Sequence, residues 1–353
     1  MKKVFVGLSG GVDSSVSALL LKQAGFDVTG VFIKAWHPDF LPCNWRAEMR
    51  DAMRVCAKLE IPFLMCDLEK LYKKEVIDYL VSEYSAGRTP NPDVMCNKEI
   101  KFGGFLKFAI ENGADFVATG HYAQKFEHGD KFSLNNSVDI EKDQTYFLWT
   151  LNQERLSRTL FPIGHLEKSE VRKIAEKNNL HTSTKKDSQG LCFIGHVDIK
   201  NFLRRYVNAK PGKVLNTKGE IVGDHEGAEL YTIGERHGFT IDNTKVSSSA
   251  HYIVSKDILK NTIMISSDQD ERESAKEVVV KNFNTIREKN FFNQQISAMI
   301  RYRGEMIAGH LKNAGGQISY VFQHRIDAVS PGQSIVFYRD GECLGGGVVD
   351  SVL

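Results

Sequence analysis

Residues 9–15, Ser-Gly-Gly-Val-Asp-Ser-Ser, combine the residue types that proteins use to hold an anion. Gly10 and Gly11 allow a tight turn and a close approach of the backbone to a bound group, because glycine has no Cβ. The helix expected behind them offers free N–H groups and the positive end of its dipole. Asp13 fits such a site if it caps the helix or helps to hold a metal. Neither the Walker ending Gly-Lys-Ser/Thr nor the GxGxxG pattern is present, so the motif predicts a phosphate loop of another type.

Two cysteines stand in irregular segments that contain proline or glycine. Cys96 precedes a helix that we expect to begin near Lys98, and the N-terminus of a helix stabilises a thiolate. Asp93, three residues earlier, is suited to act as a general acid or base. Cys192 lies in the loop 187–195, Asp-Ser-Gln-Gly-Leu-Cys-Phe-Ile-Gly. Most single cysteines are small buried hydrophobes, so for each of these two a structural and a functional role remain open.

The other four cysteines are interpreted as structural, because they stand in apolar or helical settings: Cys43, Cys56, Cys66 and Cys343. The six cysteines are far apart and include no CxxC pair, which argues against a disulfide scaffold and against a structural zinc site. No metal site is therefore predicted.

Composition is typical of a globular protein of two or three domains, with 353 residues, 42% apolar and 25% charged. No apolar run approaches the roughly 20 residues that span a bilayer, and no signal segment is evident, so a cytoplasmic location without a membrane is expected. The net charge is only +2, but residues 168–213 carry eleven Lys or Arg against four acids. That stretch is compatible with a solvated helical face and with a surface that binds phosphate.

Strand and helix signals alternate in the first part of the chain, which predicts βαβ units and a parallel sheet covered on both faces. The expected strands are 3–8, 28–33, 62–66 and 115–119, and the expected helices are 12–20, 44–59, 68–84, 98–111, 168–178 and 197–206. Ligands of such sheets bind beyond the carboxyl ends of the strands. Gly120 and His121 should therefore reach the phosphate loop, and Ile33 could line an adenine pocket or serve as plain core.

After Pro211-Gly212 the pattern changes to short alternating runs separated by turn signals. The expected strands are 213–215, 219–220, 231–233, 251–254, 262–265, 277–280, 295–301, 317–322, 334–338 and 346–349. We predict an α/β domain over 1–205, a small central domain over 206–270 and a C-terminal antiparallel β-barrel over 271–353.

Nine motifs along the chain resemble, in order and spacing, those of one enzyme family. They are SGGVDSS at 9–15, TPNPDVMCNKEIKFG at 89–103, TGHYA at 119–123, KDQTYFL at 142–148, DSQGLCFIG at 187–195, YTIGERHG at 231–238, IRYRG at 300–304, PGQ at 331–333 and CLGGGVV at 343–349. The family is that of the tRNA-specific 2-thiouridylases (MnmA type), in the ATP pyrophosphatase (PP-loop) superfamily, whose N-terminal domain is adenine nucleotide alpha hydrolase-like. Glu235 and His237 depart from its pattern, which has Gln and Arg there.

The resemblance implies that ATP with Mg²⁺ adenylates O2 of the wobble uridine (position 34) of tRNA, and that sulfur then replaces this oxygen with release of AMP and pyrophosphate. Cys192 would carry a persulfide supplied by a cysteine desulfurase or a sulfur-carrier protein. Cys96 would release the sulfur by forming a disulfide with Cys192, which is ordinary thiol exchange. Asp93 would manage protons, and no permanent cofactor is expected.

The resemblance also implies two sets of binding residues. The ATP-binding set is Gly7, Leu8, Ser9, Gly10, Gly11, Val12, Asp13, Ser14, Ile33 and Gly120. The tRNA-binding set is Asn91, Pro92, Asp93, His121, Lys142, Asp143, Gln144, Arg301, Tyr302 and Gln333. The target base would flip out of the RNA to reach these residues, and the basic stretch 168–213 would bind the phosphates of the RNA backbone.

Three other functions compete with this one. A synthetase that adenylates a small carbonyl and transfers nitrogen would share the loop 9–15 but would need no paired cysteines. An RNA-binding protein with an inactive ATP fold would not need Asp13 and both thiols. An iron–sulfur cluster on Asp93, Cys96 and Cys192 ranks low, since only two thiolates are available.

Overall fold

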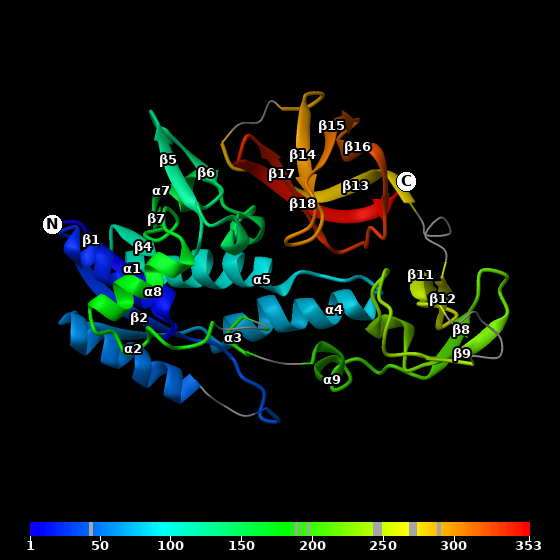
Figure 1. The fold of residues 1–353 in the computed structure, drawn as a ribbon, viewed down its shortest axis with the longest axis horizontal. Helices are drawn as coiled ribbons and strands as arrows, with labels where there is room; N and C mark the ends of the chain where they lie inside the picture. The colour runs from blue at the N-terminus through cyan, green and yellow to red at the C-terminus, as the bar shows by residue number, and fades with distance from the viewer. Residues whose placement is uncertain are drawn as a thin grey trace.

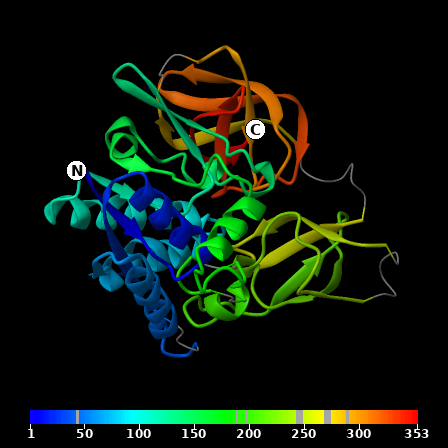
Figure 2. The same cartoon turned by 60° about the vertical axis from the view of Figure 1, so that its left-hand side comes forward.

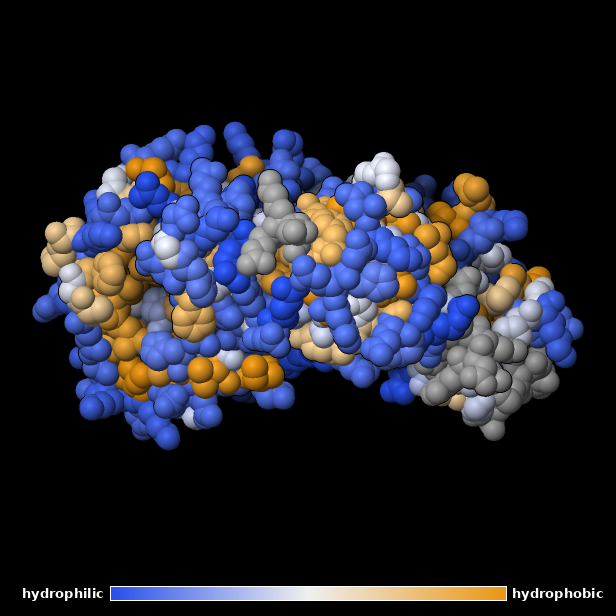
Figure 3. Space-filling view, turned by 90° about the horizontal axis from the view of Figure 1, so that it is seen from above, coloured by the Kyte–Doolittle hydropathy of each residue, from blue (hydrophilic) through white to orange (hydrophobic). Residues whose placement is uncertain are grey.

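The computed structural model describes residues 1–41, 45–187, 190, 192–195, 198–242, 249–267, 274–287 and 291–353. They form an N-terminal α/β domain, a small central β domain and a C-terminal barrel (Figure 1). Figure 2, a turned view, shows the barrel and the central domain as two separate bodies, each beside the α/β domain. Hydrophilic residues dominate the face seen in Figure 3. Among the described residues, no helix is long and apolar enough to cross a membrane.

The α/β domain is built on a five-stranded parallel sheet with the order β3-β2-β1-β4-β7. Its strands are β1 (Lys3–Gly7), β2 (Asp27–Lys34), β3 (Phe63–Asp67), β4 (Phe116–Ala118) and β7 (Thr159–Leu160). Val4 and Val6 belong to one core cluster and Phe5 to another, so both faces of the sheet are covered. This burial explains why the strands are apolar without alternation, and it confirms the predicted fold class.

The predicted helices of this domain are present, one with a different start, and three short helices over 140–142, 145–147 and 153–157 were not predicted. The helices are α1 (Val12–Gln23), α2 (Trp45–Leu59), α3 (Glu69–Tyr72), η1 (Lys73–Asp78), α4 (Tyr79–Ser85), α5 (Pro92–Met95), η2 (Cys96–Phe105), α6 (Leu106–Glu111), η3 (Ile140–Lys142), η4 (Thr145–Phe147), α7 (Gln153–Ser157), α8 (Lys168–Lys177) and α9 (Ile199–Leu203). The segments α5, η2 and α6 are one continuous run that begins at Pro92, not near Lys98. Asn91 accepts a hydrogen bond from the N–H of Val94 at 3.2 Å, and proline is favoured in the first turn. Cys96 therefore lies inside the helix and is fully buried.

The central domain is a sheet with the order β10-β9-β8-β12-β11. Its elements are β8 (Gly212–Leu215), β9 (Ile221–His225), η5 (Ala228–Leu230), β10 (Thr240–Ile241), β11 (Tyr252–Asp257) and β12 (Thr262–Ser266). The predicted strands 219–220 and 231–233 are wrong, because the first is a turn before β9 and the second pairs with no strand. Tyr231 is buried for another reason: its ring packs on His225 and its hydroxyl donates to the carbonyl of Gly238.

Six strands form the C-terminal barrel, which closes by pairing β13 with β18 and so confirms the predicted barrel. They are β13 (Ser274–Thr285), β14 (Gln295–Met299), β15 (Ile307–Ala314), β16 (Gln317–Asp327), β17 (Ser334–Arg339) and β18 (Glu342–Val352). The sequence did not predict β15, where Gly309 interrupts the apolar alternation. A Cβ on Gly309 would lie 2.3 Å from the carbonyl oxygen of Val321, so the neighbouring strand requires glycine there.

An unpredicted hairpin joins the first domain to the last. It consists of β5 (Gln124–His128) and β6 (Lys131–Asn135), and β6 pairs with β18 of the barrel. Leu134 and Cys343 meet in this pairing, and both belong to a core cluster that takes residues from both domains. The barrel thus extends into the α/β domain through a shared sheet.

Candidate active site

The phosphate loop lies between β1 and α1, where its glycines meet tightly packed backbone. Gly10 has a φ of +71°, and a Cβ there would lie 2.6 Å from the carbonyl oxygen of Glu48. Gly11 is the N-cap of α1 and provides no side-chain cap, while the hydroxyl of Ser15 donates to its carbonyl at 2.7 Å. The Ser9 and Ser14 hydroxyls are 3.3 Å apart. Free N–H groups and hydroxyls at a helix N-terminus suit a bound phosphate.

Asp13 does not cap its helix. Lys168, the first residue of α8, lies 2.7 Å from both carboxylate oxygens of Asp13, and the hydroxyl of Tyr122 donates to one of them at 2.8 Å. The Lys168 side chain is only 12% exposed, so this ion pair is largely shielded from water. The structure therefore argues against the capping role, one of the two roles that the sequence left open for Asp13.

Lys168 also reaches the segment that leads to Cys192. Its ammonium lies 2.9 Å from Oδ1 of Asp187, which also pairs with Lys142 at 2.9 Å and with Arg172 at 2.8 Å. Burial alone would raise the pKa of Asp187, but the hydrogen bonds from Lys168 and Lys142 outweigh it and lower that pKa to about 2. One lysine therefore links the phosphate loop to the loop of the second cysteine.

This pKa makes the stability of the link depend on pH in a defined direction. Because the folded pKa of Asp187 lies below its usual value near 4, the link stabilises the fold above about pH 4 and loses this effect as the pH falls towards 2. We expect Asp187→Asn to lower the melting temperature at pH 7 but to change it little at pH 2. Thermal unfolding of wild type and variant between pH 7 and pH 2 measures this difference in melting temperature. An equal loss of melting temperature at both pH values would contradict the low pKa assigned to Asp187.

Gly120 packs directly on the phosphate loop. A Cβ there would lie 2.7 Å from the backbone nitrogen of Ser14 and 2.9 Å from the carbonyl carbon of Asp13. Gly7 stands beside Ile33, since its Cβ would lie 3.7 Å from Cδ1 of that residue. Ile33 is 6% exposed and Leu8 is 2% exposed, so both are core side chains in this structure. The predicted ATP-binding residues thus come together at one edge of the sheet.

We expect Gly120→Ala to weaken ATP binding at least about tenfold, because overpacking of roughly 1–3 kcal/mol would displace the loop. Isothermal titration of the full chain with ATP-Mg²⁺ measures this. Gly25→Ala is the control: Gly25 has a φ of +82° and open space around it, so alanine costs stability without touching the loop. Equal ATP affinity in wild type and Gly120→Ala would show that the loop tolerates the methyl group.

Cys96 and Cys192 lie together as free thiols, with their sulfurs 3.0 Å apart. Burial raises the pKa of Cys96 well above its usual range, and the neighbouring Cys192 adds to this effect. The hydrogen bond from Cys96 is the main reason that the pKa of Cys192 is lowered. The expectation that a helix N-terminus stabilises a Cys96 thiolate is therefore not supported, because the helix begins before Cys96 and burial raises the pKa of this thiol. Cys192 is the member of the pair with the lowered pKa, and Cys96 donates the hydrogen bond between them.

Other groups fix the backbone at Cys192. The hydroxyl of Tyr72 donates to its carbonyl at 2.6 Å, and its N–H lies 3.3 Å from Oδ1 of Asp93. Burial raises the pKa of Asp93, although Lys101 and the N–H of Cys192 partly oppose the shift. Asp93 is thus positioned beside the thiol pair. Among the described residues, no three His, Cys, Asp or Glu side chains are grouped so as to hold a metal ion.

The remaining cysteines have no such environment. Cys56, Cys66 and Cys343 are buried, and burial raises the pKa of Cys56 to about 11 and that of Cys66 to about 12. Cys43 lies outside the described residues.

Three family descriptions together span almost the whole chain. These are a tRNA methyl transferase HUP domain over residues 2–196, a tRNA methyl transferase PRC-barrel domain over 200–267 and an aminomethyltransferase beta-barrel domain over 275–349. The tRNA-specific 2-thiouridylase MnmA of Bacillus subtilis is 44% identical over 99% of this chain and 95% of its own length. Those of Lactococcus lactis subsp. lactis and Colwellia psychrerythraea are 44% and 42% identical, over 99% of this chain and 94% and 96% of theirs. The chain belongs to the tRNA-specific 2-thiouridylase family.

Nine of the ten residues that we expected to contact tRNA in a 2-thiouridylase fall into three groups in the structure. Asn91 caps α5, Pro92 begins it and Asp93 faces the thiols. Lys142 pairs with Asp187. These four positions surround the site of the cysteines.

The residues of the next group are held by contacts within the α/β domain. Asp143 accepts hydrogen bonds from the N–H groups of Ser137 and Thr145, and the side chain of Gln144 accepts one from the N–H of Tyr122. His121 is 5% exposed and lies between the rings of Phe102 and Phe161. The structure therefore does not place His121 on an open face, contrary to our expectation that it faces tRNA.

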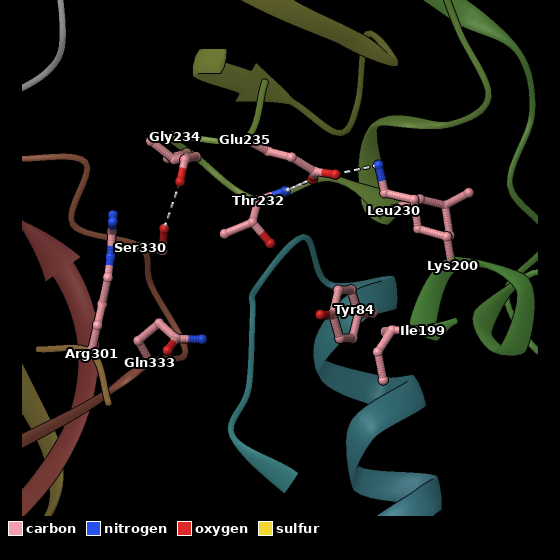
Figure 4. Close-up of a pocket in the computed structure, with 11 residues that line it drawn as sticks. Tyr84, Ile199, Lys200, Leu230, Thr232, Gly234, Glu235, Arg301, Ser330 and Gln333 are labelled. Atoms are coloured by element: carbon pink, nitrogen blue, oxygen red, sulfur yellow. Dashed lines mark hydrogen bonds and ion pairs between the residues drawn. The ribbon is translucent and has the colours of Figure 1, made fainter. Parts of the chain in front are cut away.

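The third group lies where the barrel meets the central domain. Arg301 and Gln333 line a cavity of about 440 Å³ with Tyr84, Lys200 and Glu235 (Figure 4). Gln333 donates to the carbonyl of Thr89 at 2.7 Å, which joins the barrel to the segment before Cys96. Glu235, which departs from the family pattern, pairs with Lys200 at 2.5 Å.

Tyr302 lies apart from that cavity, because its ring packs on Phe147 at 4.4 Å. The sequence analysis did not identify two residues of the site, Lys168 and Lys101. Lys168 was counted only as part of a basic stretch, and Lys101 belongs to a quoted motif but carries no signal of its own.

Proposed function

We propose that the protein uses ATP with Mg²⁺ to adenylate O2 of the wobble uridine of tRNA and replaces this oxygen with sulfur, giving 2-thiouridine, AMP and pyrophosphate. The observation that supports this most is the pair of free thiols, 3.0 Å apart, of which Cys192 follows a segment that Lys168 joins to the phosphate loop. A synthetase that only adenylates a small substrate has no use for two adjacent thiols.

The expected sequence of events assigns each residue one task. The residues Gly7–Ser14, Ile33 and Gly120 bind ATP, and Asp13 and Lys168 neutralise charge around the phosphates and Mg²⁺. Adenylation makes O2 a good leaving group. The terminal sulfur of a persulfide on Cys192 then attacks C2, and AMP departs with the C–O electrons. Cys96, deprotonated with the help of Asp93, attacks the inner sulfur, so the S–S electrons stay on the uridine sulfur and a Cys96–Cys192 disulfide remains.

Further partners follow from this chemistry. A cysteine desulfurase or a sulfur-carrier protein supplies the persulfide, and an external thiol reduces the disulfide. The tRNA-binding residues are those of the three groups above, with His121 acting from behind the pocket. We place the protein in the cytoplasm without a permanent cofactor, and we propose domain limits at 1–205, 206–270 and 271–353.

A thiolation assay tests the proposal. Purified protein, ATP-Mg²⁺, a desulfurase with cysteine and unmodified tRNA with a wobble uridine are combined, and nucleosides are measured by mass spectrometry. We expect 2-thiouridine and an equal amount of AMP. Because two of the matched families are named for methyl transfer, a parallel reaction contains S-adenosylmethionine instead of ATP and sulfur donor. Methylated uridine there, or AMP without 2-thiouridine in the first reaction, would overturn the assignment.

A further inference from the structure

One lysine, Lys101, lies among the reacting groups and has no assigned task. Its ammonium lies 3.3 Å from Nε2 of His121, and it lies close enough to Cys192 to help lower the pKa of that thiol. It also interacts electrostatically with Cys96 and Asp93. Lys101 is only partly exposed, and an ammonium with little access to water is stabilised by opposite charge beside it.

The helix geometry explains how Lys101 reaches the thiols. Cys96 and Lys101 are five residues apart, which in an α-helix would place them about 140° apart around the axis. The segment Cys96–Phe105 is instead π-helical, with hydrogen bonds from residue i to i+5, so positions five apart come onto the same side. The π-helical turn therefore brings the ammonium to the face that carries Cys96.

No other described group around the thiols can supply this positive charge. Burial, followed by the neighbouring Lys101, lowers the pKa of His121 well below its usual value, so the imidazole is neutral. Lysine is only a donor, so Nε2 of His121 accepts from it and Nδ1 holds the proton that faces Thr119 at 2.7 Å. Lys98 points to Glu99 instead, at 2.9 Å, with a side chain that is 42% exposed.

Of the remaining titratable neighbours, Asp93 and the two cysteines favour a charged Lys101, and Tyr72 adds no charge. Tyr72 from α3, Asp93 from α5 and the two cysteines are acids, and Tyr72 stays protonated because burial raises its pKa well above 10. Burial would lower the pKa of Lys101, but Cys192, Cys96 and Asp93 together raise it. The cluster thus places one ammonium beside three acidic groups, Asp93 and the two thiols.

We propose that Lys101 is a catalytic residue of the thiolation, a fixed cation that holds Cys192 as the thiolate which accepts sulfur and then neutralises the persulfide formed there. This inference rests on the proposed function. In the loading step, the Cys192 thiolate attacks the terminal sulfur of a protein persulfide, R–S–SH. A new S–S bond forms at Cys192, the donor S–S bond breaks, and its electron pair leaves with the donor as R–S⁻.

Alkylation of Cys192 by iodoacetamide tests this without tRNA, ATP or turnover. The rate is followed from pH 5 to 10 by mass spectrometry of the peptide that contains Cys192, in wild type, Lys101→Met, Lys101→Arg and Lys107→Met. Lys107 lies in the same helical run but is exposed, with a side chain that is 77% accessible, and serves as the matched control. Melting temperatures identify any variant that fails to fold.

We expect the wild-type rate to rise with a midpoint below that of an ordinary cysteine, near 8.5, and Lys107→Met to match it. Lys101→Met should raise the midpoint by more than about one pH unit and slow alkylation at pH 7 by roughly tenfold. Lys101→Arg, which keeps a positive charge, should have a midpoint and a rate close to those of wild type. A wild-type midpoint at or above 8.5 overturns the proposal, even if Lys101→Met does not fold. Equal profiles of wild type and folded Lys101→Met also overturn it. If the wild type forms no 2-thiouridine while alkylation behaves as expected, the proposed function fails and the thiolate assignment stands.

Discussion

Cys192→Ala should abolish 2-thiouridine formation, by at least about a thousandfold, while ATP binding remains as in wild type. The variant removes the sulfur that accepts and delivers the sulfane atom, and no other described thiol can take its place. Cys96 is fully buried and acts as the hydrogen-bond donor of the pair. Nucleoside mass spectrometry measures the product, and isothermal titration with ATP-Mg²⁺ measures the phosphate site.

Cys343→Ala is the control for this experiment. Cys343 is also a free and fully buried cysteine, but it lies in the barrel, where burial raises its pKa above the usual range. We expect Cys343→Ala to keep near wild-type activity with a modest loss of stability. Residual 2-thiouridine in Cys192→Ala above about a tenth of the wild-type rate would show that another group carries the sulfur.

Lys168→Met is expected to lower AMP formation about 10²- to 10³-fold, the effect of losing one preorganised charge at a reacting centre. Without this ammonium, Asp13 and Asp187 face each other with less neutralisation, and the phosphates lose a cation beside the loop. Because the same lysine holds the segment before Cys192, alkylation of Cys192 should change as well. AMP release with tRNA and ATP is the primary measurement.

Lys173→Met provides the comparison on the same helix. Lys173 is exposed, so its loss should leave AMP formation within about twofold of wild type. If both variants lose activity equally, the effect arises from the general basic charge of α8 and not from the contact with Asp13. If neither loses activity, Lys168 has only a structural role.

Much of the fold follows from local patterns in the sequence. The apolar runs at β1 and β2 and the glycines of the phosphate loop predict a parallel sheet with its ligand edge. Gly120 could be assigned to that edge because it directly follows a strand, and the structure places its Cα against Ser14. These features depend on neighbours in the chain, so the sequence displays them.

Other features depend on partners that are distant in the chain, and the sequence could not display them. Lys168 meets Asp13 across 155 residues, and Cys96 meets Cys192 across 96. The start of α5 was misplaced because Pro90 and Pro92 suggested a loop, whereas Pro92 occupies the first turn behind the Asn91 cap. Helix position alone suggested a stabilised Cys96 thiolate. In the structure burial raises the pKa of Cys96, while the hydrogen bond from Cys96, aided by Lys101, lowers the pKa of Cys192.

The hairpin of β5 and β6 has a consequence for how the enzyme matures. Tyr146 and Trp149 hydrogen-bond to Ser334 across 188 and 185 residues, and β6, which pairs with β5 on one side, pairs with β18 of the barrel on the other. On the ribosome, the helix that bears Cys96 is therefore made long before the strands that complete the core beneath it, to which Val94 and Phe102 contribute. We therefore expect that a nascent or truncated chain without the barrel has an incomplete thiol site and that Cys192 accepts sulfur only after the barrel has been synthesised.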